Sequence, residues 1–127
     1  KSLVRNGQTY FPTRAAFGIG FNGTPTAHWM YNVGTANTPY TYPAPSPNNV
    51  TQAPQPQPTE TFPTGGSVWD AYTAMGGGPM LLKNGLKNIT DTAEIFDAGS
   101  GVDPSGLAPR TAIGFTASGK YYLLVVD

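Results

Sequence analysis

Three residues near the C-terminal end have side chains that could bind an anion and transfer protons. The guanidinium of Arg110 can donate to two non-bridging phosphate oxygens at once and can stabilise charge on a departing phosphate. Thr111 adds a hydroxyl for a phosphate or sugar oxygen, and Asp127 supplies the carboxylate that glycosyl transfer needs as acid, base or nucleophile. Each residue also has an ordinary reading. Arg110 can simply bond loop carbonyls, Thr111 can be a strand threonine, and Asp127 can be a terminal residue without a role.

Three consecutive glycines form a second candidate, because their backbone N–H groups can approach a phosphate closely. Gly77 and Gly78 are the candidate substrate-binding residues in this run. The run also follows a segment that we expect to be helical, and Pro79 comes directly after it. That position favours helix termination and close packing over a phosphate cradle.

The other titratable residues give weaker signals. His28, the only histidine, lies between apolar residues, and an ordinary strand residue is a better interpretation than a catalytic base. A lone histidine without a nucleophile elbow supports no Ser-His-Asp triad. The acids Glu94, Asp97 and Asp103 could bind a cation such as calcium, but their spacing matches no loop motif, so we assign no metal. No cofactor is indicated.

Turn signals predict several β-hairpins. Asn-Gly or Ser-Gly pairs stand at 6–7, 22–23, 84–85 and 118–119, each between apolar segments. Residues 14–31 and 110–127 align without a gap, and the alignment places Arg14 on Arg110. Either the chain contains an internal repeat, with Arg14 across a cleft from Arg110, or the hairpins are alike by chance and Arg14 is a solvated surface residue.

Two segments have helical patterns. Ser67–Met75 combines a cap-like start with apolar residues at i, i+3, i+4 and i+7, and Asp91–Phe96 could begin with a capping box that uses Glu94. With about seven strands, these segments predict an α+β fold, mainly β-hairpins forming a mixed sheet with one or two short helices. The apolar run Tyr121–Val126 is expected to lie centrally in that sheet, buried on both faces.

Residues 38–63 hold eight of the thirteen prolines and are expected to form a long extended loop. The loop could be an inert linker, but strands on both sides favour a surface excursion within one domain. We therefore expect residues 1–127 to be part of one domain. A buried strand that stops at Asp127 suggests that partners of the site lie beyond it.

Composition narrows the range of functions. Charged residues make up 11% of the chain, with seven basic and seven acidic, so no basic stripe suggests a nucleic-acid partner. No apolar run approaches the roughly 20 residues of a membrane span. Cysteine is absent, which excludes thiol chemistry and disulfides. Low charge with abundant aromatic residues fits a secreted, periplasmic or cell-envelope protein, although no export signal occurs in this sequence.

Three segments in order, Gly76–Gly85, Pro109–Gly114 and Lys120–Asp127, resemble the phosphodiester glycosidase family, which includes the enzyme that uncovers capped mannose phosphate and bacterial relatives. The family pattern is G-G-P-hydrophobic-L, then R-T-A-I/V-G, then a strand ending V-D-G. Members usually also carry N-G-G-F/Y-F before the first hairpins and N-L-D-G-G-G-S after the V-D strand. Neither segment is present here, so the resemblance implies a partial domain.

The resemblance implies a hydrolase that cleaves an N-acetylglucosamine-like sugar from a phosphodiester, with a glycan or sugar-phosphate substrate. The 127 residues alone are expected to be inactive unless a complementary C-terminal fragment completes them. Two alternatives stay open. The chain could be a non-catalytic carbohydrate-binding β-rich module or a core fragment without a separate function. In the binding module, sugars would stack on Trp29, Tyr31, Tyr40, Tyr42 and Trp69.

Overall fold

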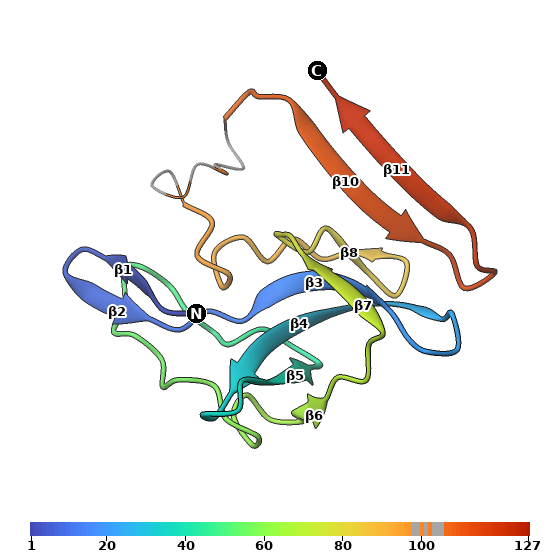
Figure 1. Cartoon of the computed structure of the whole chain (residues 1–127). Helices are drawn as coiled ribbons and strands as arrows, with labels where there is room; N and C mark the ends of the chain where they lie inside the picture. The colour runs from blue at the N-terminus through green and yellow to red at the C-terminus, as the bar shows by residue number, and fades with distance from the viewer. Residues whose placement is uncertain (98–99, 101, 103–105) are drawn as a thin grey trace.

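The computed structural model describes residues 1–97, 100, 102 and 106–127, which form an all-β fold of four antiparallel sheets (Figure 1). No helix occurs in these residues and every strand pair is antiparallel, so the predicted α+β class and the mixed sheet are both wrong. Accordingly, this part of the chain contains no helix that could cross a membrane. The strands are β1 Leu3–Arg5, β2 Gln8–Tyr10, β3 Arg14–Ile19, β4 Pro25–Val33, β5 Thr38–Tyr42, β6 Ser67–Val68, β7 Thr73–Gly76, β8 Leu82–Lys83, β9 Leu86–Lys87, β10 Arg110–Phe115 and β11 Tyr121–Val126.

The helix expected over Ser67–Met75 is replaced by two short strands on opposite edges of the central sheet, whose order is β6-β5-β4-β3-β7. β6 pairs with β5 and β7 pairs with β3, so the backbone donors of this segment bond to neighbouring strands. The face predicted to be buried is open, because Val68, Tyr72 and Met75 are all exposed. A nine-residue helix is marginal by itself, and sheet pairing outweighs its local preference.

The helix expected over Asp91–Phe96 is a tight turn instead. The amide of Ile95 bonds the carbonyl of Thr92, and the amide of Phe96 bonds that of Asp91, so no regular helical ladder forms. Ile95 has a φ of +56°, a left-handed conformation that a β-branched residue rarely adopts and that interrupts a right-handed helix.

The predicted hairpin turns are confirmed. Both residues of Asn6-Gly7 and of Asn84-Gly85 have positive φ, as a type I′ turn requires, and these pairs join β1 to β2 and β8 to β9. The turns at 22–23 and 118–119 join β3 to β4 and β10 to β11. Each of those two turns places its glycine at positive φ.

The two aligned segments form hairpins with the same register. Arg14 pairs with Met30 and Ile19 with Pro25; adding 96 to each number gives the pairs Arg110–Val126 and Phe115–Tyr121 of the second hairpin. Their surroundings differ. β3 and β4 lie inside the five-stranded sheet, whereas β10 and β11 form a separate two-stranded sheet. The matched register favours the internal repeat over a chance likeness.

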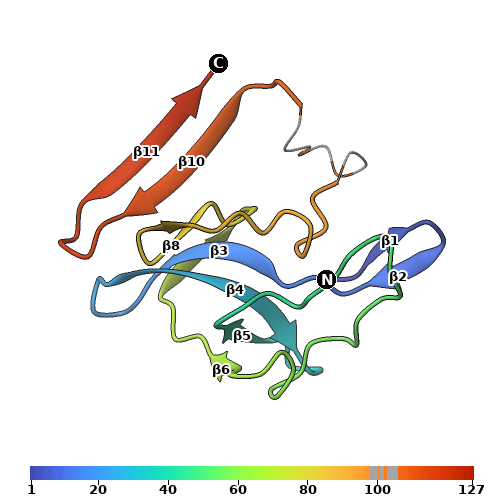
Figure 2. The ribbon, with the colours of Figure 1, turned by 180° about the vertical axis from the view of Figure 1, so that it is seen from behind.

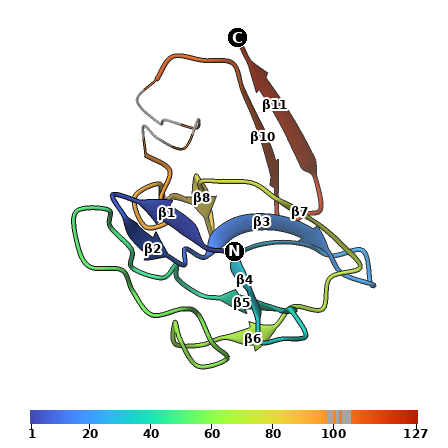
Figure 3. The same ribbon diagram turned by 60° about the vertical axis from the view of Figure 1, so that its left-hand side comes forward.

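The β10–β11 hairpin touches the rest of the molecule at its turn end. The Phe115 and Tyr121 rings lie 5.9 and 6.2 Å from the Phe17 ring of β3 between centroids. In three views the open end of the hairpin stands away from the central sheet (Figures 1, 2 and 3). All six residues of β11 are exposed, so the expectation of a central, buried strand is wrong.

The proline-rich segment is partly ordered as a strand. Its first five residues form β5, which pairs with β4 on one side and β6 on the other, so the expected loop begins after Tyr42. The rest passes β2, where the Tyr10 hydroxyl donates to the Gln52 carbonyl, and its residues Ser46, Asn48 and Pro58 are buried. Beside it lies the core, whose largest buried side chains are those of Trp29, Tyr10, Tyr42 and Ile95.

Candidate active site

Arg110 and Asp127 both lie at the open end of the β10–β11 hairpin. The register places Arg110 opposite Val126, so Asp127 follows directly on the neighbouring strand. Arg110 Nη1 donates to the Pro109 carbonyl at 3.2 Å and Nη2 donates to the Gly106 carbonyl at 3.3 Å. These are the bonds of a structural arginine. A hollow of about 450 Å³ adjoins them, lined by residues 106–109, Val126 and Asp127.

Thr111 and Asp127 are both exposed. The strand that precedes Asp127 was expected to be buried, but all six residues of β11 are exposed, and so is Asp127 itself. An exposed carboxylate has no desolvation cost, so burial gives no reason to assign Asp127 a catalytic role. Asp127 nevertheless directly follows Val126, the residue that pairs with Arg110.

Gly77 and Gly78 lie in a different part of the molecule, just past β7. The Gly77 amide donates to the Ala15 carbonyl at 3.0 Å, which extends the β3–β7 pairing and occupies one N–H of the proposed phosphate cradle. Gly78 has a φ of +128°, and a Cβ there would lie 2.7 Å from the Phe96 ring and 2.9 Å from Glu94 Oε2. Close packing explains Gly78, and these glycines are not brought together with Arg110.

Glu94 is the residue that the sequence analysis missed. Its side chain is fully buried, and four donors surround its carboxylate. Oε2 accepts from the Ala15 amide at 2.7 Å. Oε1 accepts from Trp29 Nε1 at 3.0 Å, the Met80 amide at 2.9 Å and Thr90 Oγ1 at 2.6 Å. One carboxylate thus ties β3, β4, the Gly-Gly-Pro segment and the following turn together.

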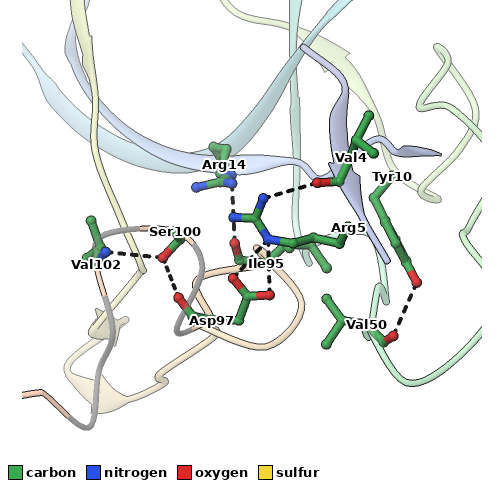
Figure 4. Close-up of polar contacts among 9 residues, drawn as sticks. All are labelled: Val4, Arg5, Tyr10, Arg14, Val50, Ile95, Asp97, Ser100 and Val102. Atoms are coloured by element: carbon green, nitrogen blue, oxygen red, sulfur yellow. Dashed lines mark hydrogen bonds and ion pairs between the residues drawn. The ribbon is translucent and has the colours of Figure 1, made fainter. Parts of the chain in front are cut away.

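Two arginines gather on the segment that follows Glu94 (Figure 4). Arg5 Nε donates to both carboxylate oxygens of Asp97, at 3.1 and 3.2 Å. Arg14 Nη2 donates to the Ile95 carbonyl at 3.4 Å, and the guanidinium carbon lies 4.0 Å from the centroid of the Phe96 ring. Burial lowers the pKa of Arg14, and the negative charge of nearby Glu94 opposes that shift in part. Arg14 is therefore not a solvated surface residue.

Comparison with known proteins identifies the family. A model of the phosphodiester glycosidase family matches residues 4–127, nearly the whole chain. The chain belongs to the phosphodiester glycosidase family. No curated protein and no solved structure gives a significant match.

The family motifs fall in two places in this structure. The R-T-A-I-G motif is the start of β10 and the V-V-D motif ends β11, so these two are hydrogen-bonded neighbours. The G-G-P motif packs against the Glu94 carboxylate: Gly78 lies next to it, and the amide of Met80, directly after the motif, donates to it. The phosphodiester glycosidase motifs thus divide between the hairpin end and the Glu94 network.

The remaining candidate ligands are engaged elsewhere. His28 lies edge-on to Trp69, with ring centroids 6.1 Å apart, and burial together with the charge of Lys83 lowers its pKa, as for an ordinary strand residue. Asp97 is occupied by Arg5, and Asp103 lies outside the described residues. Within the described part of the chain, no three His, Cys, Asp or Glu side chains come together.

The aromatic residues proposed for sugar stacking form no exposed platform. Trp29, Tyr31 and Tyr42 are buried in the core. Tyr40 and Trp69 are partly covered. The Trp69 indole packs against Gly18 and donates to Thr26 Oγ1 at 3.3 Å. These rings stabilise the sheet, and none of them favours the binding-module alternative over the phosphodiester glycosidase assignment.

Proposed function

We propose that this protein is a hydrolase that cleaves the bond between the anomeric carbon of a sugar and an oxygen of a phosphodiester. The family match over residues 4–127 carries the proposal. Two finer parts of the proposal are an N-acetylglucosamine-like sugar, which the family resemblance implies, and a secreted or cell-envelope location, which the low charge and aromatic content of the chain favour. A glycan or sugar-phosphate is the substrate.

Arg110 holds the phosphate in this proposal. Substrate binding exchanges its bonds to the Pro109 and Gly106 carbonyls for bonds to two phosphate oxygens. The hollow beside it offers room for the ligand. As the sugar–oxygen bond breaks, negative charge grows on the departing phosphate, and a preorganised guanidinium stabilises it.

Asp127 handles the proton of the attacking water. Its place next to Arg110 across the hairpin puts a carboxylate and a phosphate-binding cation at one end of the same sheet. Water adds its hydroxyl to the anomeric carbon and its proton to the departing oxygen. The products are a free sugar and a phosphate monoester, so the reaction needs no other reactant.

We further infer that residues 1–127 are inactive alone and that other residues complete the site. Arg110 and Asp127 stand on a hairpin whose strand β11 is exposed throughout. An active site normally excludes water around the reacting bond. Further polypeptide, either continuous with this chain or a complementary fragment, would supply that enclosure.

The test is hydrolysis of an N-acetylglucosamine-1-phosphodiester by the chain alone and by the chain with the sequence that flanks it in its gene. We expect activity in the extended form only. Arg110→Ala should lower its kcat/KM by about 10²–10³-fold, the usual effect of removing a preorganised donor. Lys120→Ala, an exposed cation on the same hairpin, is the matched control and should leave the rate unchanged. A rate that Arg110→Ala does not alter would refute the assigned role.

A further inference from the structure

Arg14 is a partly buried cation that bonds no carboxylate directly. Among the described residues the ion pair joins Arg5 to Asp97, and Arg14 has only the long 3.4 Å bond to the Ile95 carbonyl and the Phe96 ring beneath it. The charges of Glu94 and Asp97 attract Arg14, but the buried Glu94 carboxylate accepts its hydrogen bonds from four other donors. Removing a guanidinium from water without a bonded counter-charge is costly, and such groups gather at functional sites.

The segment Glu94–Asp97 is fixed to the core at its first residue and contacts the two arginines with the other three. Glu94 anchors it to the core, Phe96 lies under Arg14, and Asp97 pairs with Arg5. Ile95 presents its carbonyl to Arg14 while in a left-handed conformation at φ +56°. A β-branched residue is strained there, and the surrounding Glu94 bonds keep it so. The fold thus maintains a strained turn that positions two cations.

Several donors of the two arginines remain available. In the described residues no hydrogen bond uses Nε or Nη1 of Arg14, or Nη2 of Arg5. Figure 4 shows both side chains directed toward the Ile95–Asp97 segment. Asp97 already accepts on both oxygens from Arg5, so it leaves these donors unmatched. Guanidinium groups with spare N–H donors match the oxygens of a tetrahedral anion.

We propose that Arg14 and Arg5 form a binding site for a phosphate group, separate from the one assigned to Arg110. The site is built from β1, the start of β3 and the turn after Glu94, and the aromatic ring of Phe96 supports Arg14 from below. The ligand is either a phosphodiester or a free phosphate. The inference goes beyond the proposed hydrolysis and does not depend on it.

The test follows the Nε–H resonances of the arginines by NMR during titration with inorganic phosphate and, separately, with dimethyl phosphate. Ionic strength is held constant with sodium chloride. We expect saturable shifts of the Arg14 and Arg5 resonances, an affinity read at the Arg5 resonance that is at least tenfold weaker in Arg14→Gln, and an unchanged affinity in the control Lys120→Gln, which removes an exposed cation.

Each possible result either supports or overturns the proposed phosphate site. Saturation by dimethyl phosphate identifies a diester ligand, and saturation by inorganic phosphate alone identifies a free phosphate; both support the site. Shifts confined to Arg110, or none beyond those of added chloride, overturn it. If Arg14→Gln does not fold, the wild-type resonances still answer the question, and failure to detect hydrolysis has no bearing on them.

Discussion

At the scale of single residues, Glu94 joins parts of the chain that lie far apart in sequence. The carboxylate accepts hydrogen bonds from four neutral N–H and O–H groups, which belong to Ala15, Trp29, Met80 and Thr90. Several hydrogen bonds to a buried carboxylate offset the cost of removing its charge from water. Glu94 thereby fixes the Gly-Gly-Pro motif against the start of β3.

Glu94→Gln should destabilise the protein. The amide has one acceptor oxygen where the carboxylate has two, so its NH₂ group meets either the Ala15 amide or the other three donors. Leaving buried donors unpaired costs about 1–3 kcal/mol in free energy of unfolding, measurable by urea denaturation. Asp70→Asn, at an exposed position, should stay within about 0.5 kcal/mol. Equal losses in the two variants would contradict the network's role.

The raised pKa of Tyr42 leads us to expect that the folded protein loses stability at alkaline pH. Burial raises the pKa of Tyr42 to about 12 from the ordinary value of 10.0, and its hydroxyl donates to the Thr59 carbonyl at 2.7 Å. The folded state therefore favours the neutral phenol. This contribution to stability is complete below pH 10 and is lost as pH rises from there through 12.

Thermal unfolding from pH 9 to pH 12 measures this dependence. The wild-type midpoint should fall across the window. Tyr42→Phe should unfold at a lower temperature at neutral pH and lose less between pH 10 and 12, with Tyr31 and Tyr40, whose pKa values are also raised, supplying the remainder. An alkaline loss as large in Tyr42→Phe as in wild type would exclude Tyr42 as a cause.

At the scale of elements, one hairpin geometry occurs in two environments. The β3–β4 and β10–β11 hairpins share a register, and Gly18 and Gly114 occupy the same position in each. A Cβ on Gly18 would overlap the Trp69 indole, whereas one on Gly114 would meet nothing within 4 Å. Packing against Trp69 therefore requires glycine at position 18, whereas position 114 has room for a larger residue.

Alanine at the two positions is a matched pair of variants. Gly18→Ala should lower the free energy of unfolding by about 1–3 kcal/mol, because Trp69 must move from its place in the sheet. Gly114→Ala should change it by less than about 0.5 kcal/mol. Chemical denaturation of both variants checks this. Similar losses would show that Trp69 does not pack on Gly18 as described.

Turns were predictable from the sequence because their signal is local. Asn-Gly supplies two residues that tolerate positive φ, and both Asn6-Gly7 and Asn84-Gly85 adopt it. The helix over Ser67–Met75 failed because its competitor is distant: β3 and β5 offer hydrogen bonds that no local pattern reveals. Glu94 was misread as a helix cap for the same reason, since its partners lie up to 79 residues away.

The candidate site was predictable only through the family resemblance. Arg110 and Asp127 do share one end of a hairpin, which the aligned turns at 22–23 and 118–119 already suggested. Their catalytic roles remain predictions. The Arg5–Arg14 pair could not be anticipated, because it depends on a turn that the sequence analysis took for a helix.

At the scale of the whole molecule, the chain separates into a packed sheet and an open hairpin. The central sheet buries Trp29 and Tyr42, while Leu123 and Val125 on β11 are 81% and 71% exposed. A strand of that composition is usually covered on both faces. The exposed hairpin, which carries Arg110 and Asp127, is thus a surface suited to further polypeptide that would enclose the proposed hydrolytic site.

The central claim is that this protein breaks the sugar–oxygen bond and leaves the phosphorus–oxygen bond intact. The most direct test is hydrolysis of an N-acetylglucosamine-1-phosphodiester in water enriched with ¹⁸O by the chain with its flanking sequence. Mass spectrometry of the sugar and ³¹P NMR of the phosphate locate the label. The account predicts ¹⁸O in the anomeric hydroxyl and none in the phosphate monoester. Label in the phosphate would mean attack at phosphorus and would contradict the assignment as a glycosidase.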